Sequence, residues 1–130
     1  MKALTIKQPW ASLIINGHKT YELRSWKTTY RGKILIHTSK QEEKKEIKRF
    51  ENYNLDYINS AIIGEAEITD CIKIDEAFYE KLNKLNKEIY KIDNYENLYA
   101  WKLENIKKYE VPIYTKGKLG LWNYKITEEK

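Results

Sequence analysis

Apolar residues along this chain follow two spacings, alternation with polar residues and recurrence every three or four positions. Alternation or a short apolar run predicts strands at residues 3–6, 20–26, 31–39, 61–74, 99–109 and 111–126. Helical spacing predicts helices at residues 8–19, 40–53 and 75–92. Strands therefore dominate both ends of the chain, and helices fill the gaps between them.

This order of elements predicts an α+β fold, a small mixed-strand barrel flanked by helices. Gly64 interrupts the strand at 61–74 and predicts a β-bulge there. The chain has no internal repeat and no proline- or glycine-rich linker. We therefore expect one domain over residues 1–130.

The first predicted helix carries both a start signal and a stop signal. Pro9 suits the first helical turn, and Gly17 suits the C-terminal cap. Trp10, Leu13 and Ile14 share one face at helical spacing. We expect that face to press onto the core, with Trp10 as its anchor.

The strand at 20–26 has one apolar face and one ionic face. Tyr21 and Leu23 point to the first face, while Glu22 and Arg24 point to the second. Lys19 stands at the entrance of the strand beside them. The three charged side chains are therefore expected to converge on one pocket.

Two roles suit this charged trio. In a functional site, Arg24 fixes Glu22 by a bidentate ion pair, so that the carboxylate accepts a hydrogen bond from a base or takes a proton. Lys19 then meets a phosphate or an oxyanion, or acts as a general base or nucleophile in a partly dry cleft. In the other role, the trio is a structural salt-bridge cluster at a strand edge. Spacing alone leaves both open.

Composition points toward a polyanionic partner. The net charge is +5, and the chain holds four tryptophans and eleven tyrosines. Basic residues bind phosphates, and aromatic rings stack on bases. Charge alone is a weak indication, and the aromatic content strengthens it.

The sequence offers little for metal or membrane chemistry. Cys71 is the lone cysteine, which fits a reducing compartment and leaves no thiolate cluster for structural zinc. Glu65 and Glu67 share a strand face, where acidic residues commonly face solvent. No apolar run reaches the roughly 20 residues of a membrane span, and the N-terminus lacks a signal-peptide core. We expect a cytoplasmic protein with no metal, no cofactor and no membrane partner.

Three blocks of sequence resemble the ASCH domain, the activating signal cointegrator homology family. They are QPWASLIINGHKTYELRSWKTTYRGKILIHTS, which contains G-x-K-x-x-E-x-R, then GEAEITDC, and finally YAWKLENIKKYEVPIYTKGKLGLWNY. The first block is the most specific, and together they cover nearly the whole chain. The resemblance implies a PUA-like pseudo-barrel with a cleft beside the first helix, in a family thought to handle RNA or DNA.

With this resemblance, further residues become candidates for nucleic-acid contacts. Candidates for stacking on bases are Trp10, Trp26, Tyr30 and Trp122, of which Trp26 is favoured because it directly follows the ionic strand. Candidates for reading base edges are Gln8 and Ser25, which serve equally well as caps or turn residues. Candidates for phosphate contacts are Arg31, Lys33, Lys116 and Lys118.

The first hypothesis is a module that binds RNA, single-stranded DNA or a modified nucleotide in the cleft of Lys19, Glu22 and Arg24. The alternative is a hydrolase with the same three residues as its catalytic group, either an N(4)-acetylcytidine amidohydrolase or a ribonuclease. Small bacterial relatives with the amidohydrolase activity have a lysine that matches Lys19, but a threonine at the position of Glu22. A weaker third hypothesis is an accessory subunit that binds other proteins. Sequence reasoning makes no prediction of oligomeric state.

Overall fold

A computed structural model describes residues 1–125 of the chain. Its elements are β1 (Lys2–Gln8), α1 (Trp10–Ile15), β2 (Tyr21–Arg24), β3 (Gly32–Glu42), α2 (Lys44–Arg49), the 3-10 helix η1 (Glu51–Tyr53), β4 (Ala61–Lys73), α3 (Glu76–Leu85), β5 (Tyr99–Tyr114) and β6 (Leu121–Asn123). The predicted α+β class is confirmed. The predicted last strand runs to Ile126, which lies outside the described residues.

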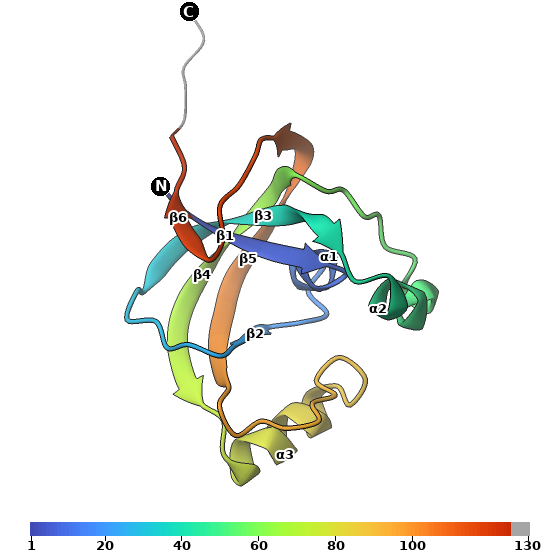
Figure 1. Ribbon diagram of the computed structural model, residues 1–130, viewed down its shortest axis with the longest axis vertical. Coiled ribbons are helices and arrows are strands. Elements are labelled where there is room, and N and C mark those ends of the chain that lie inside the picture. The colour runs from blue at the N-terminus through green and yellow to red at the C-terminus, as the bar shows by residue number, and fades with distance from the viewer. Residues whose placement is uncertain (126–130) are drawn as a thin grey trace, which may run out of the picture.

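All six strands belong to one sheet with the order β2-β5-β4-β3-β1-β6. The pair β1 and β3 is parallel and the other pairs are antiparallel, so the sheet is mixed, as predicted. Figure 1 shows this sheet coiling around on itself, which brings β1 and β2 toward each other across its open side. The result is a pseudo-barrel with a seam, because β1 and β2 are not neighbours in the sheet.

Gly64 lies at an irregularity in the sheet, as the sequence predicts. The register of β4 against β5 shifts between Ile62 and Gly64, and that of β3 against β4 shifts between Ile36 and His37. A Cβ atom at position 64 would lie 2.3 Å from Cδ1 of Ile15. Glycine at this bulge therefore lets α1 pack directly on β4.

Two apolar clusters form the main core, one on each side of β2 and β5. The first fills the barrel between the sheet and α1, and the second lies between the sheet and the segment around α3. Leu13 and Ile14 are fully buried. Trp10 differs from the prediction, since it packs against both clusters but is only half-buried. Its indole N–H needs a polar partner, which keeps one edge of the ring at the surface.

All three predicted helices are shorter than expected, since α1 covers only Trp10–Ile15 and α3 ends at Leu85. The strand β3 continues to Glu42, because Glu42 pairs with Gln8 of β1, and α2 begins only at Lys44. The helix α3 begins after Asp75, whose carboxylate accepts a 2.8 Å hydrogen bond from the Phe78 amide. No helix within residues 1–125 is long and apolar enough to cross a membrane.

Candidate nucleic-acid interface

The charged trio lies together at the start of β2. Lys19, in the turn after α1, donates to Oε1 of Glu22 at 3.1 Å and to the carbonyl oxygen of Tyr21. The Arg24 Nε donates to the other carboxylate oxygen of Glu22 at 2.9 Å. Lys19 and Glu22 are buried, whereas Arg24 is half-buried.

The two cations keep Glu22 ionised. Burial on its own raises the pKa of the Glu22 carboxyl, but the charges and hydrogen bonds of Lys19 and Arg24 outweigh it. The net result is a pKa below the ordinary value of 4.5. Glu22 is therefore a fixed anion that orients two cations at the surface of the core.

Arg24 also joins the two sides of the seam. Its second guanidinium nitrogen donates to the carbonyl oxygen of Thr5 in β1 at 2.8 Å. Since β1 and β2 share no ladder of their own, this bond links strands that the sheet leaves apart. The ionic face of β2 thus helps to hold the pseudo-barrel closed.

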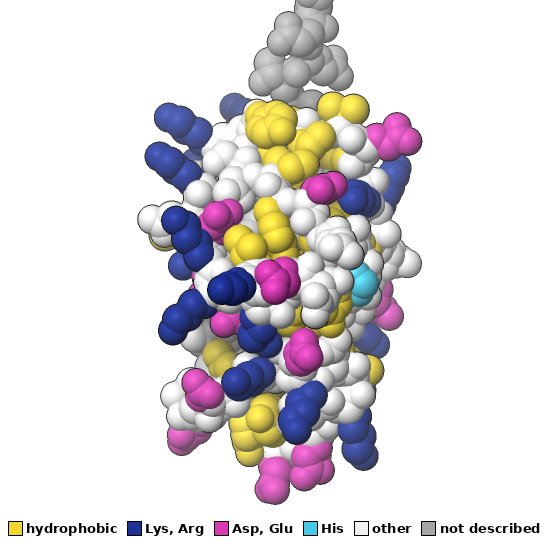
Figure 2. Space-filling view, turned by 90° about the vertical axis from the view of Figure 1, so that its right-hand side faces the viewer, with side chains coloured by type: hydrophobic (Ala, Val, Ile, Leu, Met, Phe, Trp, Pro, Cys, Tyr) yellow, Lys and Arg dark blue, Asp and Glu magenta, His cyan; other side chains and the backbone are white. Residues whose placement is uncertain are grey.

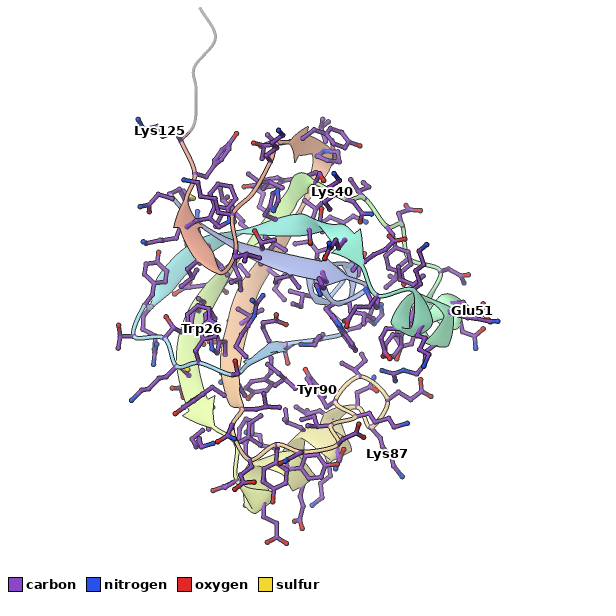
Figure 3. The ribbon with its side chains drawn as sticks, in the orientation of Figure 1. Trp26, Lys40, Glu51, Lys87, Tyr90 and Lys125 are labelled. Atoms are coloured by element: carbon purple, nitrogen blue, oxygen red, sulfur yellow. The ribbon has the colours of Figure 1, made fainter. Side chains whose placement is uncertain are left out.

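Aromatic rings surround the Lys19 ammonium group. It lies 5.7 Å from the ring centroid of Trp10 and 5.8 Å from that of Tyr90. The Tyr90 hydroxyl accepts the amide N–H of Thr20 at 2.9 Å. Figure 3 shows Tyr90 between α3 and β2, so the segment after α3 supplies one wall around the trio.

Three adjoining pockets lead from the seam to the loop after β5, and together we call them the long groove. The inner pocket has a volume of about 150 Å³ and is lined by Trp10, Lys19, Glu22, Leu23, Ile89 and Lys91. The middle pocket, about 310 Å³, shares Trp10, Glu22 and Leu23 with it. The loop pocket, about 510 Å³, shares Thr5, Ser39 and Leu119 with the middle pocket. The three pockets therefore adjoin one another, from the trio to the loop after β5.

Cations outnumber carboxylates along the long groove. Its basic lining residues are Lys7, Lys19, Arg24, Lys40, Lys91, Lys116 and Lys118. Its acidic lining residues are Glu22, which is ion-paired, and Glu43, which accepts the indole N–H of Trp10. Within residues 1–125, the groove lysines outside the trio, which are Lys7, Lys40, Lys91, Lys116 and Lys118, form no ion pair. This lining suits an extended polyanion.

Two tryptophans flank the long groove. Trp10 lines the inner and middle pockets. Trp26 is 39% exposed and stands edge-on to Trp101, with centroids 4.5 Å apart. It lies against Gly120, which lines the middle pocket. Figure 3 shows Trp26 at the end of β2 away from Tyr90. Trp122 is buried on β6, the strand beside β1, and its indole donates to the Thr5 hydroxyl at 2.9 Å.

Several candidates from the sequence lie elsewhere. Gln8 is fully buried, with its amide bonded to Ser12 and Ile58, so it has the structural role of a cap. The Tyr30 hydroxyl donates to the backbone of Lys33, and Arg31 donates to the backbone of its own turn. Lys33 pairs with Glu65 on β4 at 3.3 Å. Ser25 is exposed and does not line the groove.

The sequence gives no indication that several other residues line the groove. They include Thr5, Lys7, Lys40, Glu43, Lys91 and Leu119. The exposed lysines carry no local signal, because 24 lysines and arginines are spread over the whole chain. Figure 2 shows basic and acidic side chains interspersed over one face. Charge therefore identifies the interface only when combined with the shape of the groove.

Two further questions about the described residues are whether a second pocket suits a polyanion and whether any side chains could hold a metal ion. A pocket of about 210 Å³ lies beside α1 and includes Lys108 together with Asp56 and Glu110, so its charge is not basic. Within residues 1–125, no group of three or more His, Cys, Asp or Glu side chains gathers to hold a metal ion.

A family model of the ASCH domain matches residues 4–113. The chain belongs to the ASCH domain family. Activating signal cointegrator 1 of Homo sapiens is 31% identical over 97 residues, which cover 65% of this chain, and the Mus musculus protein gives the same values. The chain matches only 16% of the length of each of these relatives.

Solved structures show the same fold. The crystal structure of ASCH from Zymomonas mobilis superposes with a TM-score of 0.57 and 16% identity, covering 87% of this chain and 72% of that chain. A mutant of the same protein gives a TM-score of 0.61 and 14% identity, covering 95% of this chain and 87% of that chain. These matches confirm the α+β pseudo-barrel that the resemblance implied.

Proposed function

We propose that this domain binds single-stranded RNA or DNA along the long groove. The observation that carries the proposal is the lining of the groove, in which lysine and arginine side chains outnumber two carboxylates that are already bonded to protein groups. Backbone phosphates contact the exposed lysines, and their counterions are released on binding. Membership of the ASCH family agrees with this function.

The aromatic rings favour a single strand over a duplex. Because Trp10 lines the groove and Trp26 is exposed at its margin, we expect both rings to stack on the faces of unstacked bases. In a duplex those faces are hidden by neighbouring base pairs. Leu23 adds an apolar side chain to the wall of the inner and middle pockets, which Trp10 also lines. The groove therefore holds phosphates by charge and bases by stacking.

The same geometry supports binding better than hydrolysis. The Lys19 ammonium group donates to two oxygen acceptors and faces two rings, so two of its three N–H donors are already bonded to the protein. Glu22 is held as an anion by two cations, which makes its carboxylate a weak base. Neither group is arranged like an activated nucleophile with an adjacent base.

Fluorescence anisotropy with a labelled oligonucleotide tests the proposal. We expect single-stranded RNA or DNA to bind more tightly than a duplex of the same sequence. We also expect the affinity to fall as salt rises, with a slope of about 0.7 per phosphate contacted. Salt-independent binding, or equal affinity for the duplex, would count against binding in the groove.

A panel of modified nucleosides with product analysis tests the hydrolase alternative. The experiment compares wild type with Lys19→Ala. Turnover by wild type but not by the variant would favour a hydrolase.

A further inference from the structure

His37 lies beneath the loop pocket. Its side chain is nearly inaccessible, at 2% exposure, and forms part of the floor of that pocket. Nε2 of the ring lies 2.8 Å from the carbonyl oxygen of Thr115, and Nδ1 lies 3.1 Å from the hydroxyl of Thr5. The loop after β5 is pressed onto the ring, since a Cβ atom on Gly117 would lie 2.3 Å from it. Both ring nitrogens are therefore committed to protein partners.

Counting protons around the Thr5 hydroxyl shows which form of His37 satisfies every partner. The hydroxyl has one proton, which it donates to the carbonyl oxygen of Lys118 at 2.7 Å. It also accepts the indole N–H of Trp122. With its only proton given to Lys118, the hydroxyl can meet Nδ1 of His37 only as an acceptor, so Nδ1 must carry a proton.

The other ring nitrogen also needs a proton, because a carbonyl oxygen such as that of Thr115 can only accept. The imidazolium form of His37 thus completes all four hydrogen bonds. In the neutral form, the Thr5 hydroxyl turns to Nδ1 and the Lys118 carbonyl loses its donor. Protonation of His37 therefore adds one bond that fastens the loop carrying Lys116 and Lys118.

The groups that face His37 explain which ligand favours its charge. Three neighbours of His37 on adjacent strands are uncharged. They are the hydroxyl of Thr5 on β1, the indole of Trp122 on β6, and Ile62, which pairs with His37 from β4. The charged side chains that line the pocket are those of Lys40, Lys116 and Lys118. No carboxylate of residues 1–125 lines it. A bound anion is therefore the counter-charge that this pocket lacks, and the lysines attract one.

We propose that the loop pocket is a phosphate subsite of the long groove, and that filling it is coupled to protonation of His37. The phosphate contacts the lysines, while the imidazolium beneath it fastens the loop. This inference rests on the proposed function, because it takes the phosphate to belong to a bound strand. It adds a site for one phosphate and a dependence of affinity on pH.

The direction of the pH effect follows from linkage. If an anion favours the imidazolium, then the imidazolium favours the anion by the same factor. Histidine is the side chain that changes charge between about pH 5 and pH 8. Affinity for a strand is therefore expected to rise as the pH falls from 8.0 to 6.0, by about fivefold or more.

Nitrogen NMR of the His37 ring tests the subsite directly in the wild-type protein. The probe is inorganic sulfate, which resembles a phosphate group and keeps its charge across this range, titrated against chloride at constant ionic strength and pH 7. We expect sulfate to shift His37 toward the imidazolium pattern, with both ring nitrogens protonated. A His37 ring that does not respond to sulfate overturns the proposal.

Oligonucleotide binding at pH 6.0 and 8.0 provides the second test, with His37→Gln as the variant. Glutamine keeps one donor and one acceptor but cannot gain a proton in this range. His18→Gln is the matched control, because His18 is exposed and packs edge-on to Tyr53 away from the groove. We expect His37→Gln to lose the pH dependence and His18→Gln to keep it.

Equal pH dependence in wild type and His37→Gln overturns the coupling. The sulfate titration needs no nucleic acid, so it separates the two proposals. If no strand binds but sulfate still protonates His37, the proposed function fails and the anion subsite stands. If a strand binds but sulfate leaves His37 unchanged, the proposed function stands and the subsite fails.

Discussion

Both ends of the long groove carry basic side chains, but these side chains have different roles at the two ends. At the inner end, the cations Lys19 and Arg24 are paired with Glu22 and packed against the core. At the outer end, Lys116 and Lys118 stand exposed on a loop. Charges at the inner end are part of the architecture, since they span the seam. Charges at the outer end are available to a ligand. Basic residues in one groove therefore need separate tests of stability and of binding.

The largest expected effect is at Glu22. Glu22→Gln leaves two cations facing each other without a carboxylate, so we expect the free energy of unfolding to fall by about 3–5 kcal/mol. Chemical denaturation measures this, and Glu80→Gln on the exposed face of α3 is the control. If Glu22→Gln changes the free energy of unfolding no more than the control does, the trio does not stabilise the fold. If it is stable yet loses one to two orders of magnitude in affinity, Glu22 contacts the ligand directly.

Trp10 is expected to have the next largest effect. Because its ring is half-buried between the two apolar clusters, Trp10→Ala should lower the free energy of unfolding by about 2–3 kcal/mol, less than for a fully buried tryptophan. Trp26→Ala should cost less stability and weaken binding of a strand by about 1–3 kcal/mol, the value of one base stack. Thermal melts and titrations that give the reverse order would exchange the roles of the two rings.

Acidification below pH 4.5 should remove a stabilising contribution at the inner end. Because the pKa of Glu22 is lowered in the folded protein, its ionised form contributes stability above the ordinary pKa of 4.5. That contribution is lost as the pH falls below 4.5 and through the folded pKa. Denaturation midpoints measured from pH 6 to pH 3 should therefore fall more steeply for wild type than for Glu22→Gln. Parallel curves would contradict the lowered pKa.

The smallest effect on stability is expected at the outer end. Lys118→Ala should change the free energy of unfolding by less than about 0.5 kcal/mol, because the side chain is exposed. It should also remove about one phosphate contact from the salt dependence of binding. Lys33→Ala is the matched control, an exposed lysine paired with Glu65 outside the groove. Equal loss for both lysines would move the interface onto β3 and β4.

The sequence predicted the inner end well and the outer end only in part. The alternation at Tyr21–Arg24 indicates that the charges share a face, because a strand has a period of two. The bond from Arg24 to Thr5 was not predictable, since it depends on how the sheet coils. Lys40 was assigned to a helix, but pairing of β3 with β1 keeps it in a strand. Local charge patterns do not reveal such tertiary constraints.

The position of a bound strand tests the central claim most directly. Amide and indole NMR signals of the protein, titrated with a short single-stranded RNA, locate the interface residue by residue. We predict the largest shifts along the groove, at the indoles of Trp10 and Trp26 and at the amides of Gly117 and Leu119. Shifts centred instead on Lys33 and its neighbours on β4 would contradict the account.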